Sequence, residues 1–167
     1  MTSLFASPKV NQVAIVVRDL DATMRNYWEM LGIGPWSVYT FAPPLVKEMT
    51  YRGRLQDYAI RLALAQAGDV LYELVQPLSG ENIFEEHLQR KGESVHHIGV
   101  FVESYDQAVA EAMRQGHTVI QSGKGYGRWG DGAYGFLDTE ESLGVIVELI
   151  QVPRERVKPE RIFPEST

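Results

Sequence analysis

Four polar side chains interrupt stretches of sequence that are otherwise apolar. Gln12 and His97 each stand inside a segment rich in β-branched residues, and Glu73 and Glu148 each break an aliphatic one. A carboxylate is costly to bury without a partner, and a cation is a natural one. Because the chain has no cysteine, nitrogen and oxygen atoms must supply the ligands of any metal. The four donors suit one divalent ion, with zinc, nickel or cobalt favoured and manganese or iron as alternatives.

The four residues fall at equivalent places in a sequence repeat. VNQVAIVVRDLD at Val10–Asp21 resembles VHHIGVFVESYD at Val95–Asp106, and these segments contain Gln12 and His97. DVLYELVQP at Asp69–Pro77 resembles GVIVELIQVP at Gly144–Pro153, and these contain Glu73 and Glu148. Two matching pairs in the same order indicate a duplicated module. Solvent-facing polar residues would not need to coincide in this way, so the repeat favours a shared site.

Each module reads as a strand, a helix and then further strands. The pattern predicts an α+β fold of two tandem βαβββ modules, whose curved mixed sheet surrounds the metal site. At 167 residues and 44% hydrophobic, the chain is expected to form a single domain. The expected parts are module 1 at about 8–78, a connecting helix at 79–92, module 2 at 93–153 and a polar tail at 154–167. The tail is expected to be disordered or to lie over a neighbouring subunit.

Capping and breaking residues place the helices. The first helix should begin after Asp19 and end at Gly32, and its counterpart at 106–115 should end at Gly116. The connecting helix should be capped by Ser79 and closed by Gly92. The expected strands after each first helix are Leu45–Arg52, Ala59–Ala65 and Val70–Val75, then Thr118–Gln121, Gly132–Leu137 and Val145–Val152.

Strand alternation predicts which neighbours share a face with the donors. Ala14 should lie on the face of Gln12, and Gly99 on that of His97; both are small, which predicts an open volume for a ligand. His96 should point to the opposite face and be structural. Two further histidines are expected at the surface, His87 and His117.

A glycine-rich segment, GKGYGRWGDGAYG at 123–135, predicts a mobile hairpin or lid over the site. The residues proposed to contact the substrate are Lys124, Arg128, Trp129 and Arg61, with Arg52 and Arg54 as alternatives. The aromatic residues Trp28, Trp36, Tyr39 and Phe41 are expected in the core, with lining of the pocket as the other possibility.

Overall composition excludes several classes of partner. A net charge of −6 and a pI near 5.2 argue against binding a polyphosphate backbone, so no nucleic acid is expected. No stretch approaches the roughly 20 apolar residues needed to cross a bilayer, and the N-terminal segment lacks the pattern of a signal peptide. A cytoplasmic protein with no membrane partner is expected.

The same motifs carry a family resemblance. VNQVAIVVRDLDATMRNYWEMLGI, YELVQP, VHHIGVFV and GFLDTEESLGVIVELIQ, in this order, resemble the glyoxalase and methylmalonyl-CoA epimerase branch of the vicinal-oxygen-chelate superfamily over about residues 8–153. In that family the first and last strands of each module donate one metal ligand apiece, which implies Gln12, Glu73, His97 and Glu148. This order of ligands resembles the eukaryotic type of glyoxalase I. Epimerases usually begin with His, so Gln12 counts against that activity, and the single matching His counts against an extradiol dioxygenase.

The resemblance and the ligands together imply a metal-dependent lyase or isomerase. Such an enzyme removes a proton next to a carbonyl of a small oxo-acid, thioester or thiohemiacetal, and we expect Glu148 to act as the base and Glu73 to return the proton. The family's epimerases carry a further glutamate on the strand before the second ligand, where this chain has Arg61 and, nearby in sequence, Glu48. A homodimer is expected. The alternatives are a protein that sequesters an antibiotic without chemistry and an iron-dependent dioxygenase.

Overall fold

The computed structural model describes residues 9–165. The segment 1–8, for which the sequence predicts no signal peptide, lies outside the described residues. Within residues 9–165 no helix is long and apolar enough to cross a membrane.

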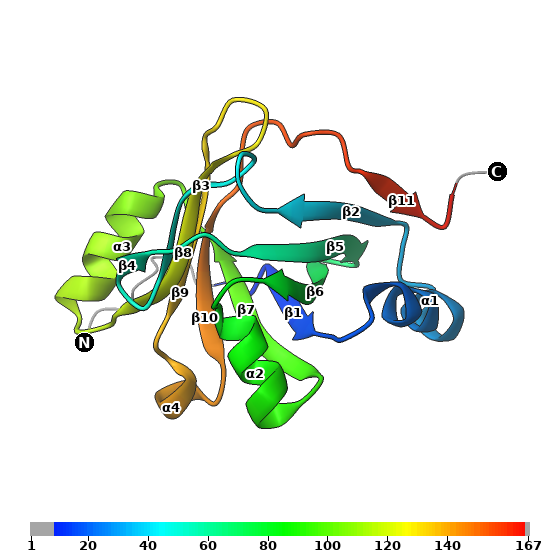
Figure 1. Cartoon of the computed structure of the whole chain (residues 1–167), viewed down its shortest axis with the longest axis horizontal. Coiled ribbons are helices and arrows are strands. Elements are labelled where there is room, and N and C mark those ends of the chain that lie inside the picture. The colour runs from blue at the N-terminus through cyan, green and yellow to red at the C-terminus, as the bar shows by residue number, and fades with distance from the viewer. Residues whose placement is uncertain (1–8, 166–167) are drawn as a thin grey trace.

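The described chain contains two similar halves joined by a helix (Figure 1). The first half contains β1 (Gln12–Val16), α1 (Leu20–Leu31), β2 (Trp36–Phe41), β3 (Lys47–Tyr51), β4 (Arg54–Leu55), β5 (Ala59–Ala67) and β6 (Val70–Ser79). The connecting helix is α2 (Ile83–Lys91). The second half contains β7 (Ser94–Phe101), α3 (Tyr105–Arg114), β8 (Val119–Tyr126), β9 (Gly132–Leu137), α4 (Glu140–Leu143) and β10 (Ile146–Gln151), and β11 (Arg161–Phe163) follows.

All the strands belong to one curved, unclosed mixed sheet, as predicted. Its order is β11-β2-β5-β6-β1-β7-β10-β9-β8-β3-β4. In each half the first strand pairs in parallel with the last, β1 with β6 and β7 with β10, and the two first strands pair antiparallel at the centre. The repeat in the sequence is therefore a repeat in the sheet, with the two copies joined at β1 and β7.

The hairpin of β3 and β4 departs from the expected topology. The segment Leu45–Arg52 was predicted as a strand within module 1, but β3 crosses to the other end of the sheet and pairs with β8 of module 2. The strand that occupies its expected place is β2, which pairs with β5. No strand was predicted there, only a cluster of aromatic core residues. The aromatic and β-branched residues of β2 are typical of strands, so that signal was present in the sequence.

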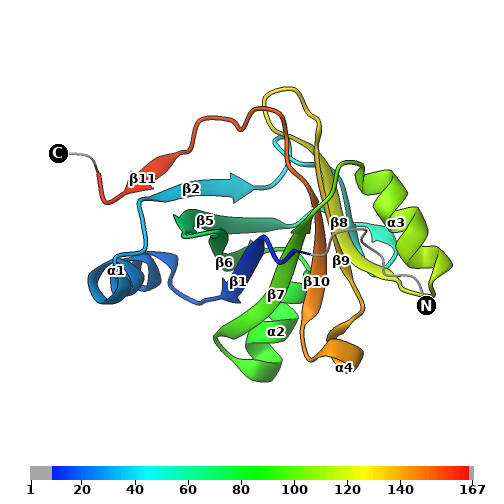
Figure 2. The same cartoon turned by 180° about the vertical axis from the view of Figure 1, so that it is seen from behind.

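Three apolar clusters fill the two faces of the sheet. Helix α1 packs on the outer face of the first half with Leu20 and Met24, and α3 covers the outer face of the second half with Tyr105 and Ala112. The third cluster fills the concave interior, and Phe84 of α2 is buried in it. Figures 1 and 2 show α1 and α3 at opposite ends of the molecule and α2 near its middle.

Local signals define the helix ends, with one correction. The Asp19 carboxylate accepts a hydrogen bond from Ala22 N at the start of α1, and Gly32 ends that helix in a left-handed conformation. At α2 the cap is Asn82, which accepts from the amides of Phe84 and Glu85, rather than the predicted Ser79. Residues as far as Ser79 continue β6, so the helix starts only after the chain has turned.

The C-terminal tail is ordered as far as it is described and folds over its own chain. Strand β11 pairs with β2 and so extends the sheet at its edge. Both outermost strands, β4 and β11, are short, and short edge strands limit pairing with other chains. The expected disordered tail or arm over a neighbour is therefore replaced by a strand that covers an edge of this chain's own sheet.

Candidate metal centre

Four adjacent strands at the centre of the sheet bring the four predicted donors together. The strands lie in the order β6-β1-β7-β10 and contribute Glu73, Gln12, His97 and Glu148 respectively. Ala14 on β1 is in register with Glu73 on one side and His97 on the other. Its small side chain lets Glu73 and His97 meet above it.

The polar atoms of these side chains are within hydrogen-bonding distance of one another. Gln12 Nε2 donates to Glu73 Oε2 at 3.1 Å and to Glu148 Oε2 at 3.0 Å. His97 Nε2 lies 3.1 Å from the same two oxygen atoms and 3.4 Å from Gln12 Nε2. All four side chains are buried.

These separations fit a single small cation. Ligands at 2.0–2.1 Å from a metal lie about 2.9 Å apart at right angles and about 3.3 Å apart at the tetrahedral angle. The observed 3.0–3.4 Å falls in that range, and Glu73, His97 and Glu148 form a group that could hold a metal ion. Ligation by Gln12 would use its amide oxygen, which a half turn about the last side-chain torsion brings to the place of Nε2.

The charges at the site also suit a cation. Burial by itself lowers the pKa of His97, but the charge of Glu148 and hydrogen bonds to Glu148 and Glu73 outweigh it and raise that pKa to about 9. Burial raises the pKa of Glu148, while His97 opposes that rise. His97 therefore holds a proton at a position where a divalent ion could replace it.

A β-bulge turns both histidines of β7 into the interior, which corrects the prediction for His96. The register of β7 against β1 passes from His97, opposite Ala14, to Val95, opposite Ile15, so His96 is the extra residue. At a bulge two residues oppose one and the usual alternation is interrupted. His96 is buried, and its Nδ1 lies 2.8 Å from His97 Nδ1.

His87 also differs from the prediction, because it is buried rather than at the surface. Its Nε2 lies 2.8 Å from Ser94 Oγ, and its ring packs edge-on against His96. His117 is half-buried at the end of α3, near Asp138.

The volume that Gly99 leaves is filled by neighbouring side chains. A Cβ atom at Gly99 would lie 2.7 Å from Ile150 Cδ1 and 2.8 Å from Gln12 Cβ. The absence of a side chain at Gly99 therefore makes room for Gln12 in the cluster. The predicted open volume for a ligand at this position is wrong.

A small cavity of about 30 Å³ adjoins the cluster. Its walls are formed by Gln12, Phe41, Leu62, Leu64, Glu73, Tyr126, Tyr134, Glu148, Ile150 and Arg156. Of the aromatic residues singled out in the sequence, Phe41 lines this cavity, Trp36 and Tyr39 are core, and Trp28 is exposed. Arg156 was missed because it lies in the tail outside the repeat, where only its charge marks it.

None of the predicted substrate-contacting residues lines this cavity. Lys124 pairs with Asp106 at 2.8 Å, and Arg128 pairs with Glu155 at 2.6 Å. Trp129 is exposed at the hairpin tip. Because Leu62 and Leu64 face the cavity, strand alternation turns Arg61 to the opposite face of β5.

Glu48 is also away from the cluster. It is exposed and lies at a separate cavity with Tyr105 and Lys124, while its neighbour Met49 points into the core. Glu48 therefore supplies no further acid beside the cluster.

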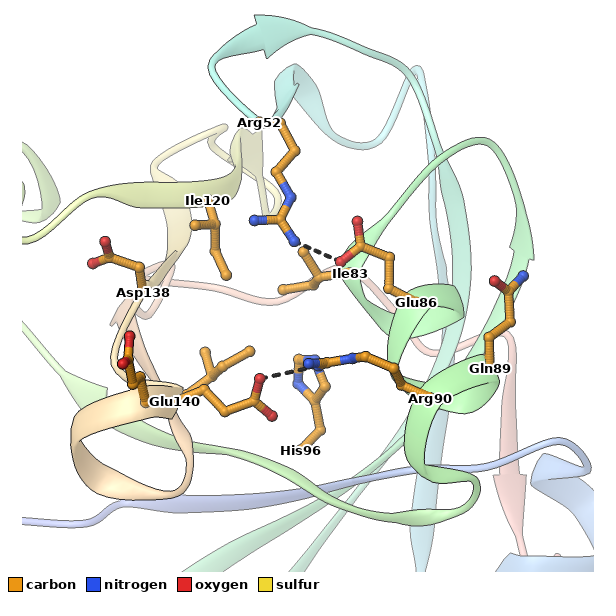
Figure 3. Close-up of a pocket in the computed structure, with 11 residues that line it drawn as sticks. Arg52, Ile83, Glu86, Gln89, Arg90, His96, Ile120, Asp138 and Glu140 are labelled. Carbon is orange, nitrogen blue, oxygen red and sulfur yellow. Dashed lines mark hydrogen bonds and ion pairs between the residues drawn. The ribbon is translucent and has the colours of Figure 1, made fainter.

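A larger cavity, of about 630 Å³, shares no lining residue with the small one. Figure 3 shows Arg52 paired with Glu86 and Arg90 paired with Glu140 around it, with His96 at its base. Its size suits a small molecule, but its walls mix both signs of charge. The groups that could hold a metal lie beside the smaller cavity.

Comparison with known proteins agrees with this architecture. Residues 11–136 match the model of the Glyoxalase/Bleomycin resistance protein/Dioxygenase superfamily. A curated relative, the uncharacterized protein YqjC of Bacillus subtilis (strain 168), is 27% identical over 97 residues, which cover 58% of this chain and 69% of that protein.

Two solved structures are similar in fold. A Streptomyces coelicolor methylmalonyl-CoA epimerase variant in complex with 2-nitronate-propionyl-CoA is 21% identical, with a TM-score of 0.65 over 89% of this chain and 97% of that one. The methylmalonyl-CoA epimerase of Mycobacterium tuberculosis is 20% identical, with a TM-score of 0.60 over 86% of this chain and 88% of that one. At such identities the likeness concerns the fold alone. Because the family model spans most of the chain and the sheet has the paired architecture described above, the protein belongs to the glyoxalase, bleomycin resistance protein and dioxygenase superfamily.

Proposed function

We propose that this protein is a divalent-metal-dependent lyase or isomerase that removes a proton from the carbon next to a carbonyl group. The substrate would be a small oxo-acid, thioester or thiohemiacetal. The observation that carries the proposal is the convergence of Gln12, Glu73, His97 and Glu148, with their polar atoms 3.0–3.4 Å apart in a buried site. A bound divalent ion supplies Lewis-acid stabilisation of the carbonyl oxygen while the neighbouring carbon loses its proton.

The chain's own carboxylates supply the proton transfer. Glu148 is buried and its pKa is raised, which brings a carboxylate closer to the basicity that general-base catalysis requires. Glu73 approaches from β6, on the other side of β1 and β7. The two acids thus flank the cluster, and Glu73 could return a proton to the opposite face of the carbon. Without a metal, hydrogen bonds from Gln12 and contacts with His97 hold both acids in place.

The residues around the cluster count against the usual epimerase within this class, and they favour the class over a dioxygenase or a sequestering protein. By the family resemblance, an epimerase of the usual kind needs a further acid on the strand before the second ligand, and the residues of β5 that line the cavity here are Leu62 and Leu64. The cluster contains one histidine, whereas the iron site expected of an extradiol dioxygenase in this family has two histidines and one glutamate. A protein that only sequesters a ligand has no need for two carboxylates and an imidazole in contact within its core, because each is costly to bury.

The proposal is tested by metal content and by proton exchange. The purified protein should bind about one equivalent of zinc, nickel or cobalt. The metal-loaded protein is then incubated in D2O with a panel of oxo-acids, thioesters and thiohemiacetals. In one of these compounds the hydrogen next to the carbonyl should exchange for deuterium, which NMR detects. Less than about a tenth of an equivalent of metal, unresponsive to added ions, would favour sequestration.

A further inference from the structure

From the course of the C-terminal tail we infer that residues 153–160 form a strap over the metal centre and that Arg156 binds an anionic group of the substrate. The site would then select carbonyl compounds that carry a carboxylate. This inference rests on the proposed function, since it concerns the substrate of the same site. The strap leaves the end of β10 and crosses to β11 at the far edge of the sheet (Figures 1 and 2).

The strap is attached at both of its ends. At its start, the backbone amide of Arg128 in the β8–β9 hairpin donates to the carbonyl of Glu155 at 2.9 Å. At its end, Thr40 N donates to Glu160 Oε1 at 2.9 Å, and Glu160 N donates to the carbonyl of Val38 at 2.9 Å. These attachments join the two halves of the sheet across its open side.

Between the attachments the strap is held by side-chain packing. Val157 packs against the interior cluster, and Arg156 lines the cavity beside the four donors. Within the described part of the chain, residues 156–159 make no hydrogen bond at 3.5 Å or less. Segments with few hydrogen bonds and shallow packing open at low free-energy cost. The middle of the strap can therefore lift while both ends stay attached.

The size of the cavity requires such an opening. Its volume of about 30 Å³ accommodates about two waters, which is too small for a substrate with a carbon skeleton. A second cavity of about 10 Å³ lies next to it and shares Phe41, Tyr126 and Arg156 as walls. Lifting Arg156 and Val157 would join the two cavities and expose the donors from the concave side.

The charge balance points to an anion. A divalent ion would be neutralised by Glu73 and Glu148, with Gln12 and His97 neutral, so Arg156 would leave a net positive charge at the cavity. Arg156 is the cationic side chain among the lining residues, and no ion pair to another described residue occupies it. A guanidinium binds a carboxylate through two parallel hydrogen bonds. The strap would thus close over a substrate whose carbonyl faces the donors and whose carboxylate faces Arg156.

The test compares how tightly two small ligands of similar shape bind to the Co²⁺-loaded protein. Pyruvate and pyruvamide have nearly the same shape and both present adjacent carbonyl groups, but only pyruvate is an anion. Their affinities are measured from changes in the visible spectrum of the bound Co²⁺. We expect tighter binding of pyruvate, and Arg156→Gln should weaken pyruvate binding by about 10- to 100-fold while leaving pyruvamide binding nearly unchanged. Arg156→Lys should restore part of the loss. Arg154→Gln is the matched control, because Arg154 lies on the strap but pairs with Asp131 outside the cavity.

The outcomes separate this inference from the proposed function. Failure of the wild-type protein to take up Co²⁺ would contradict the metal centre itself. Normal Co²⁺ uptake with no binding of pyruvate, or with equal loss of both ligands in Arg156→Gln, would overturn the role of Arg156 alone. A readout that needs no metal is amide hydrogen exchange, which should be faster at Val157 and Lys158 than in β10. Equal protection of strap and strand would exclude a strap that lifts.

Discussion

The Nδ1 atoms of His96 and His97 lie 2.8 Å apart, because the bulge in β7 turns both rings into the interior. If Nε2 of His97 binds a metal, its Nδ1 carries a hydrogen and donates to His96 Nδ1. Complete burial and the charge of His97 lower the pKa of His96 well below its usual value, so His96 stays neutral and can accept. His96 therefore orients the ligand from behind.

Replacing His96 should weaken metal binding although it is not a ligand. His96→Leu removes the acceptor for the His97 N–H, and loss of such supporting contacts typically lowers metal affinity by about 10- to 100-fold. His96→Asn retains an acceptor oxygen and should lose less. Calorimetric titration with Zn²⁺ measures both variants, and unchanged affinity in His96→Leu would remove the positioning role.

His97→Ala should abolish metal binding, because it removes the one nitrogen ligand of the cluster. The secondary structure should be retained, because the change removes a side chain from the cluster and leaves the strands paired. Metal analysis and circular dichroism measure the two effects. His117→Ala is the control, since that half-buried histidine lies at the end of α3, away from the cluster. A His97→Ala protein that keeps its metal contradicts the site assignment.

Glu148→Gln should separate binding from proton transfer. The substitution keeps an oxygen donor but removes the basic carboxylate, so metal affinity should fall modestly while hydrogen exchange at the substrate carbon falls by about 10²–10⁴. Glu73→Gln is the matched comparison, since Glu73 is the residue equivalent to Glu148 in the repeat. Equal losses would mean that both acids move protons. Near-normal exchange in a metal-loaded Glu148→Gln protein would leave Glu148 as a ligand only.

Metal affinity should rise with pH over the range in which His97 loses its proton. The pKa of His97 is raised to about 9 without a metal, and the ion needs the unprotonated nitrogen. Below that pKa each pH unit should weaken binding about tenfold for one displaced proton. Correspondingly, the metal-free protein gains stability from the protonated His97 below its unfolded pKa and loses it as pH rises through about 9. Calorimetry at pH 6.5, 7.5 and 8.5 measures the metal affinity, and chemical unfolding at the same pH values measures the stability of the metal-free protein. A metal affinity that does not change over this range would be inconsistent with displacement of the His97 proton.

Gly127 should be required for seating the strap. Its φ is +90°, and a Cβ atom there would overlap with Pro153 Cβ. Gly127→Ala should destabilise the protein by more than the roughly 1 kcal/mol that a positive φ typically costs, and should increase amide exchange in 154–160. Gly130→Ala is the control, because its φ is also positive but its nearest neighbour would be 3.6 Å away. Equal destabilisation of the two variants would show that the contact with Pro153 does not hold the strap.

Sequence alone determined the parts of this protein that depend on local pattern and on the repeat. The cap at Asp19 and the end of α1 at Gly32 follow from the conformational preferences of single residues. The four donors Gln12, Glu73, His97 and Glu148 meet because strand alternation in two copies of one module brings equivalent residues on paired strands to the same place.

Tertiary structure decided what those patterns do not encode. The inward turn of His96 depends on how β7 pairs with β1, and the crossing of β3 depends on an edge that only the second module provides. Arg156 reaches the metal centre because the strap ends on β2, far away in sequence. Lys124 and Arg128 are held elsewhere by Asp106 and Glu155. Each of these placements is set by contacts between distant segments, and side chains outside the repeat had no second copy to indicate their position.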